Sequence, residues 1–179
     1  MILKTGHRAS SHEHRDIVMT QHRMEKLINE CDKHLERIRR AHTKMALFMP
    51  LDASRYAELS DDEVEHIDQF LFRFAKLQDA IGEKLFVSML EFLKEENPKN
   101  KPFIDILNRL ERLGLLDNKN VWLELRKIRS NIAHQYEDEP AQASNALNAI
   151  YLAKPALESI YLAIKTRYIE LRDSVSGAL

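Results

Sequence analysis

Hydrophobic residues recur along most of the chain at alternating steps of three and four, which is the spacing of one face of an α-helix. The first such stripe consists of Met24, Ile28, Cys31, Leu35, Ile38, His42 and Met45. It predicts one long amphipathic helix of about 30 residues. Ser10 and Glu13 have the spacing of a capping box and would begin this helix, and Pro50 would end it.

A second long stripe follows after a connector over residues 51–59. It consists of Ile67, Phe70, Phe74, Leu77, Ile81, Leu85, Met89 and Phe92. Ser60 and Glu63 form a capping box in front of it, so we expect a helix that begins there and ends near Asn97. Gly82 lies inside this helix, where glycine costs about 1 kcal/mol relative to alanine. We therefore expect a neighbouring helix to approach closely at Gly82.

Three further helices are predicted in the rest of the chain. Pro102 is suited to the first position of a third helix, and Gly114 would end it. A fourth helix begins near Asn118 and ends in the acidic stretch 137–140, and its stripe is Val121, Leu125, Ile128 and Ile132. A fifth begins around Pro140, and its inner face is Ala146, Ile150, Leu157, Ile160, Ile164, Tyr168 and Leu171.

Five helices with short connections predict an all-α, up-and-down bundle. The chain of 179 residues contains only four glycines and five prolines, and no segment alternates as a strand would. We expect a flexible N-terminal tail over residues 1–14 and a single helical domain over residues 15–176. The tail carries three histidines, but no carboxylate or thiol framework surrounds them, so a metal site is not predicted there.

Composition and charge narrow the functional classes. Lys and Arg together number 27 and Asp and Glu number 28, so a generic nucleic-acid coat is excluded and RNA would need a local basic patch. Cys31 is the only cysteine and lies on a hydrophobic stripe, which indicates a packing role in a reducing compartment. Neither a membrane span nor a signal peptide is indicated, so we expect a cytoplasmic protein.

Polar residues suited to chemistry concentrate in the fourth predicted helix. They are Arg126, Lys127, Arg129, Ser130, Asn131, His134 and Tyr136. A histidine titrates near pH 6.5 and transfers protons at neutral pH, and an arginine holds a phosphate through paired hydrogen bonds. This set suits cleavage of a phosphodiester. Attack by the 2′-hydroxyl of RNA requires no metal, no cofactor and no protein nucleophile.

The spacing of Arg129 and His134 occurs a second time, in Arg37 and His42. His42 falls on the hydrophobic stripe of the first helix, and no Asn or Tyr follows it. We interpret that copy as core and surface residues that share the spacing by chance. His134 has the corresponding alternative of a helix-capping or core histidine.

The segments 122–136 and 72–86 resemble HEPN-domain proteins, in particular HepT-like toxins, and the likeness spans roughly residues 60–175. The resemblance implies a homodimer whose motif helices meet across a cleft and cleave RNA to a cyclic phosphate. Arg129 and His134 would be catalytic, with Ser130 and Asn131 as polar helpers. Ser130 stands where the family more often has Asn. An MNT-type nucleotidyltransferase would neutralise such a toxin by attaching AMP to Tyr136.

Arg126 and Lys127, doubled in a dimer, would supply the basic groove for RNA. Arg109 and Arg112 either join this groove or form a solvated face. Asp79 is either part of the cleft or an ordinary surface carboxylate. Two other functions stay open: a non-catalytic HEPN protein that binds a nucleotide or a nucleotidyltransferase, and a structural adaptor that pairs through the stripe of the first helix.

Overall fold

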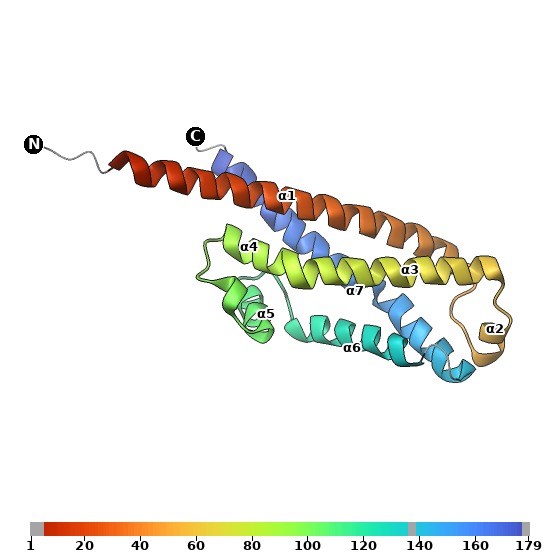
Figure 1. The fold of residues 1–179 in the computed structure, drawn as a ribbon. Coiled ribbons are helices and arrows are strands. Elements are labelled where there is room, and N and C mark those ends of the chain that lie inside the picture. The colour runs from red at the N-terminus through yellow and green to blue at the C-terminus, as the bar shows by residue number, and fades with distance from the viewer. Residues whose placement is uncertain (1–5, 136–138, 177–179) are drawn as a thin grey trace, which may run out of the picture.

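The computed structural model of the chain describes residues 6–135 and 139–176 (Figure 1). Over these residues it contains helices, turns and short connections but no β-strand. The predicted all-α class is therefore confirmed. The two longest helices are α1 (Gly6–Met45) and α7 (Pro140–Ser176).

Helix α1 begins earlier than its sequence indicates. It starts at Gly6, so Ser10 and Glu13 lie inside it and do not cap it. Residues 6–14, predicted as a tail, belong to the helix. The predicted stripe is largely correct, because Met24, Cys31, Leu35, Ile38 and Met45 are all buried. The contacts of this stripe lie within its own chain.

The second long stripe forms a nearly straight rod made of α3 (Asp61–Asp79), a π-helical turn η1 (Ala80–Leu85) and α4 (Phe86–Phe92). Its predicted capping box is confirmed. The Ser60 hydroxyl accepts from the Glu63 N–H at 3.3 Å, and the Glu63 carboxylate accepts from the Ser60 N–H at 3.0 Å. That backbone hydrogen bond is the main reason why the pKa of Glu63 is lowered. The predicted connector contains a short helix, α2 (Ala53–Ala57), which the sequence did not indicate.

Gly82, in the π-helical turn of the rod, lies against the Trp122 side chain of α6 (Lys119–Gln135). A Cβ atom built on Gly82 would lie 2.8 Å from Cζ2 of Trp122, closer than real Cβ atoms approach other atoms. The expected close approach is confirmed. The Trp122 ring also meets the Phe86 ring edge-on, with centroids 4.7 Å apart.

The connection from α4 to α6 contains a 3₁₀ turn, η2 (Pro98–Asn100), and α5 (Phe103–Arg112). Pro102 caps α5 and is not its first helical residue. Gly114 ends α5 as predicted. It adopts a φ of 67°, which favours glycine, and its N–H donates to the Glu111 carbonyl at 3.0 Å. The Leu115 N–H donates to the Leu110 carbonyl at 2.9 Å, which completes a Schellman motif.

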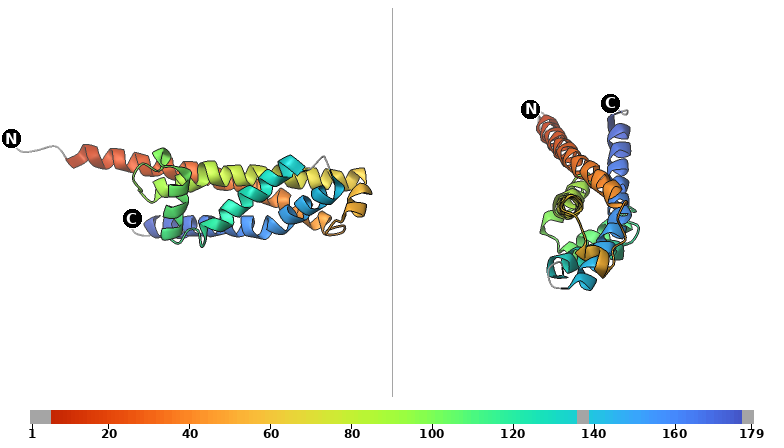
Figure 2. Two further views of the ribbon diagram at one scale, coloured as in Figure 1. Left: turned by 90° about the horizontal axis from the view of Figure 1, so that it is seen from below. Right: turned by 90° about the vertical axis from the view of Figure 1, so that its right-hand side faces the viewer.

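The helices pack in pairs, as Figures 1 and 2 show. Helix α1 runs beside α3, α6 packs on α7, and α7 crosses the α1–rod pair at an angle. The predicted inner face of α7 is buried except for Leu171, which is half-buried. On α6 one prediction is wrong: Val121 is exposed, and Trp122 takes the buried position instead.

Candidate functional site

Arg129 lies on the packed side of α6 and not on its outer face. Trp122, Leu125, Arg129 and Ile132 follow one another at steps of three, four and three, so they share one side of the helix. Trp122 and Leu125 are buried and Arg129 is half-buried. The guanidinium is therefore directed towards the rod, where a carboxylate receives it.

Asp79, the last residue of α3, forms an ion pair with Arg129. Arg129 Nη1 and Nη2 donate to the two carboxylate oxygens, the second over 3.3 Å, so the contact is forked. The two side chains are 38% and 37% exposed, and such pairs contribute only about 0–1 kcal/mol to stability. The main consequence of the pair is orientation of the guanidinium. Of the two interpretations of Asp79, the structure favours a place at the site.

The packing around this pair fixes its geometry. Asp79 directly precedes the π-helical turn, and π-bulges are frequent at functional sites. Within that turn Gly82 admits the Trp122 ring, which holds α6 against the rod. Trp122 precedes Arg129 by two helical turns on the same side of α6. The contact of Trp122 with Gly82 and the pair of Arg129 with Asp79 therefore join the same side of α6 to the rod.

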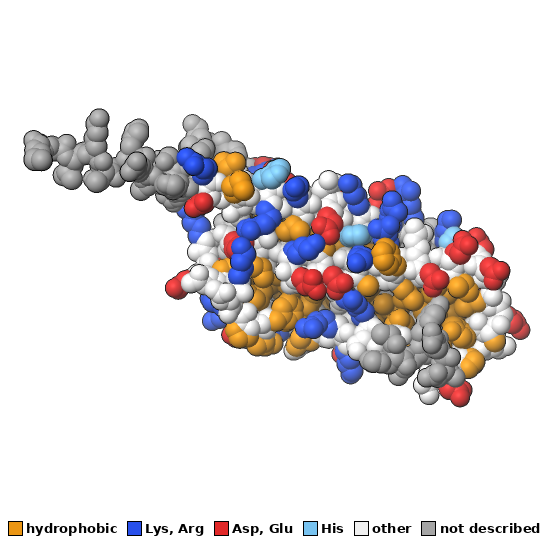
Figure 3. Space-filling model, viewed as in Figure 1, with side chains coloured by type: hydrophobic (Ala, Val, Ile, Leu, Met, Phe, Trp, Pro, Cys, Tyr) orange, Lys and Arg blue, Asp and Glu red, His pale blue; other side chains and the backbone are white. Residues whose placement is uncertain are grey.

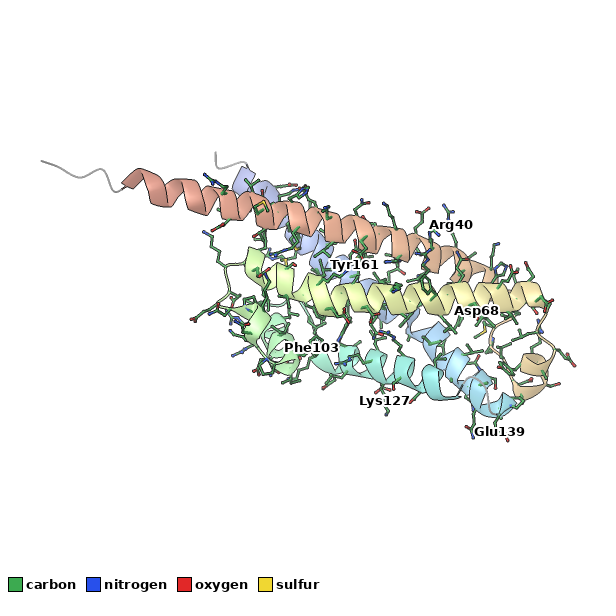
Figure 4. All side chains as sticks on the ribbon, in the orientation of Figure 1. Arg40, Asp68, Phe103, Lys127, Glu139 and Tyr161 are labelled. Atoms are coloured by element: carbon green, nitrogen blue, oxygen red, sulfur yellow. The ribbon has the colours of Figure 1, made fainter. Side chains whose placement is uncertain are left out.

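Several other predicted site residues lie on different sides of α6. Ser130 and Asn131 are exposed. Lys127 is exposed as well, and Figure 4 shows it on the side of α6 that faces away from α3. Positions two apart differ by about 200° around a helix, so neither Lys127 nor Asn131 is brought together with Arg129.

Arg126 lies between α6 and α5. It is exposed, and its guanidinium carbon stands 5.2 Å from the centre of the Phe103 ring. Arg109 does not join it, because its Nε and Nη2 each donate to the Glu95 carboxylate at 2.7 Å. These hydrogen bonds hold the pKa of Glu95 below its ordinary value. Arg112 donates to the carbonyl oxygen of Asn108, one turn earlier on α5. Arg126 and the exposed Lys127 therefore remain as candidates for a basic groove.

The two remaining motif residues are only partly described. The backbone of His134 belongs to α6, but its side chain lies outside the described part of the structure. Position 134 is about 140° around the helix axis from position 129. Tyr136 lies outside the described residues.

Cys31 has the packing role that its position in the stripe predicted. It is fully buried, and burial, followed by the nearby carboxylates of Glu30 and Asp32, raises the pKa of its thiol to about 12. A thiol of that pKa is not a nucleophile at neutral pH. Among the described residues no three His, Cys, Asp or Glu side chains gather as a metal site, and no helix there is long and apolar enough to cross a membrane.

The described part of the site offers an oriented cation at a half-exposed position. Two of the five N–H donors of Arg129 are used by Asp79, and a phosphate accepts from such a fork readily. Ser130 adds a hydroxyl one position further along α6. Neither family models, nor curated proteins, nor solved structures give a match to this chain.

Proposed function

We propose that the protein is a HEPN-like, metal-independent ribonuclease that acts as the toxin of a toxin–antitoxin pair. The observation that carries the proposal is the Arg129–Asp79 pair, a half-exposed guanidinium oriented from the neighbouring helix. Support also comes from the residues that surround Arg129 in sequence and from their resemblance to the HEPN motif. Asp79 is then a positioning residue and Arg129 a phosphate-binding one.

In the proposed reaction, the 2′-oxygen of a ribose attacks the adjacent phosphorus and the bond to the 5′-oxygen breaks. His134 makes one of the two proton transfers: either it accepts the 2′-hydroxyl proton and water protonates the leaving 5′-oxygen, or water accepts the first proton and His134 delivers the second. Arg129 stabilises the negative charge that grows on the phosphoryl oxygens. The products are a 2′,3′-cyclic phosphate and a 5′-hydroxyl. Because positions 129 and 134 lie on different sides of α6, we propose that two α6 helices of a homodimer combine to form each site.

The chemistry is tested with the purified protein, a single-stranded RNA and a chelator. We expect cleavage with cyclic phosphate ends that persists without metal and stops when the ribose at the cut is 2′-deoxy. Arg129→Gln should reduce the rate by about 10²- to 10³-fold, the usual loss for one donor to a developing charge. The control Arg167→Gln alters an exposed arginine paired with Glu170 on α7 and should cleave normally. Cleavage that needs the metal would contradict the proposal.

The cellular role has its own test. Expression should arrest growth, and His134→Ala should relieve the arrest while the helical content and the oligomeric state stay unchanged. An MNT-type nucleotidyltransferase encoded beside this chain would be the expected antitoxin, with Tyr136 as the residue that receives AMP. Tyr136→Phe should then escape neutralisation. Full toxicity of both Arg129 and His134 variants would exclude the assignment.

A non-catalytic binding module is the second candidate, and one observation favours it. The charge of Arg129 is already balanced by Asp79, and Ser130 and Asn131 are exposed at about 100° and 200° around the axis of α6 from Arg129. A purified dimer that binds a nucleotide without cutting RNA would support this alternative. The structural adaptor is disfavoured, because the stripe of α1 that would pair with a partner is buried within its own chain.

A further inference from the structure

One aromatic side chain of α3 is exposed although its neighbours are core residues. Phe70 and Phe74 are fully buried, whereas Phe72 is 53% exposed. It lies on the same side of α3 as Asp79, since seven residues make about two helical turns. The ring is therefore displayed beside the proposed site, about 10 Å along the helix axis from Asp79.

Two cations border the Phe72 ring. The Arg73 guanidinium carbon is 5.2 Å and Lys76 Nζ is 5.7 Å from its centre. Arg73 also donates to Nδ1 of His34 on α1 at 3.3 Å, and the charges of Glu30 and Arg37 act on the same imidazole in opposite directions. Together Phe72, Arg73, Lys76, His34 and Arg37 form a basic-aromatic cluster across α1 and α3. Figure 3 shows Lys and Arg side chains over α1 and α3, with Asp and Glu side chains among them.

The cluster keeps most of its positive charge. No carboxylate among the described residues pairs with Arg37, Arg73 or Lys76, whereas most other arginines of the bundle have such partners. Burial and then the charge of Arg73 lower the pKa of His34, so its imidazole is neutral and accepts from Arg73. The exposed Asp68, labelled in Figure 4, lies one turn before Phe72 and bounds the cluster.

We infer that this cluster binds single-stranded RNA, with one base stacked on Phe72 and its phosphates held by Lys76 and Arg73. An exposed ring inside unpaired positive charge suits a polyanion that carries flat bases. A duplex keeps its bases stacked inside, so it would not use the ring. The inference rests on the proposed function, because it names the RNA that would reach Arg129, but it concerns binding and not cleavage.

The test measures binding of a fluorescent 2′-O-methyl single-stranded oligonucleotide, which lacks the attacking hydroxyl. Phe72→Ala and Phe72→Leu should raise Kd by about 5- to 150-fold, the range for loss of one stacked base. Phe72→Trp keeps an aromatic ring and should retain the Kd of the native protein. The control Ile104→Ala removes a comparably exposed hydrophobic side chain, 45% exposed on α5, and should bind normally.

Salt dependence separates the two parts of the cluster. Lys76→Gln should reduce the slope of log Kd against log salt by about 0.7, the value for one phosphate contact on a single strand. Phe72→Leu should leave the slope unchanged, because a ring contributes no charge. Lys101→Gln, which changes an exposed lysine between η2 and α5, outside α1 and α3, is the control and should preserve both Kd and slope.

The possible outcomes are distinct. Binding that depends on Phe72 without any cleavage would support the cluster and overturn the proposed nuclease. Cleavage with binding indifferent to Phe72 and Lys76 would overturn the cluster and leave the nuclease standing. Equal affinity for duplex and single strand would also overturn it. A smaller species of Phe72→Ala in sedimentation would show instead that the surface joins two molecules of this chain, and would overturn it as well.

Discussion

Two arginine–histidine pairs share one spacing in this protein and occupy different surroundings. In α1, His42 is half-buried and stacks on Tyr151 of α7 with ring centres 4.1 Å apart and planes 9° from parallel, while Arg37 is exposed on the opposite side. In α6, Arg129 is the inward residue and meets Asp79 across the contact with the rod. In the first pair the histidine packs in the bundle, and in the second the arginine does.

The difference shows that spacing along a helix does not define a site. What distinguishes Arg129 is the residue on the neighbouring helix, a carboxylate that orients the guanidinium while leaving it half-exposed. His42 has an aromatic ring as its neighbour, and burial followed by the charge of Lys154 lowers its pKa. A neutral, stacked imidazole contributes to packing and not to proton transfer at neutral pH.

The largest expected effect separates the two histidines by activity. His134→Ala should reduce the rate of RNA cleavage by about 10²- to 10⁴-fold, the usual contribution of a general acid or base. His42→Ala should change the rate less than twofold, although the loss of its stacking lowers stability by roughly 0.5–1.5 kcal/mol. Rates are measured on RNA under single-turnover conditions. If both variants lost the same amount of cleavage rate, the distinction between the two arginine–histidine pairs would be wrong.

The next effect concerns the packing that places Arg129. Gly82→Ala should lower the free energy of unfolding by about 2 kcal/mol, because the added methyl meets the Trp122 ring and its overpacking outweighs the helical preference for alanine. In a Trp122→Phe background the same change should cost little, since the smaller ring makes room. Urea unfolding of the four proteins measures the coupling. Additive effects would contradict the close approach.

Removal of the carboxylate tests orientation directly. Asp79→Asn should lower kcat for RNA cleavage by about tenfold with a small change in KM, as expected when a transition-state contact is misplaced. Its unfolding free energy should change by less than about 1 kcal/mol, the usual worth of such an exposed pair. The control is Glu170→Gln, which disrupts an exposed pair with Arg167 elsewhere on the bundle. Loss of activity there too would point to a general structural effect.

The smallest expected effect is a change in the pH dependence of the free energy of unfolding. Because burial lowers the pKa of His42 in the folded state, the unfolded chain binds more protons below its own pKa of about 6.5. The contribution of neutral His42 to the free energy of unfolding is therefore complete above about pH 6.5. It decreases as the pH falls towards the pKa of His42 in the folded state. His42→Phe should reduce the slope of unfolding free energy between pH 7 and pH 5, where His34 contributes in the same direction. An unchanged slope would contradict a neutral His42.

Local features were predictable from sequence and contacts across the chain were not. The caps at Ser60 and Gly114 were correct because they depend on neighbouring residues and on backbone preferences. The start of α1 was placed too late because a polar helix start carries no stripe. On α6, Val121 was preferred to Trp122 because it fits the four-residue step to Leu125 equally well, although Trp122 is the buried residue. The pairing of Arg129 with Asp79 joins residues 50 apart, which no local pattern specifies.

The π-helical turn at Ala80–Leu85 determines how α4 is rotated about the rod axis relative to α3. The buried positions after Leu77 include Ile81, Leu85 and Met89, which follow it at three successive steps of four. In a regular α-helix each such step overshoots a full turn by about 40°, so three would carry the stripe about 120° away from α1. The extra residue in the π-helical turn absorbs this surplus, and α1 contacts α3, η1 and α4 in succession. Deletion of one residue there would rotate α4 against α1 while α3 kept its place.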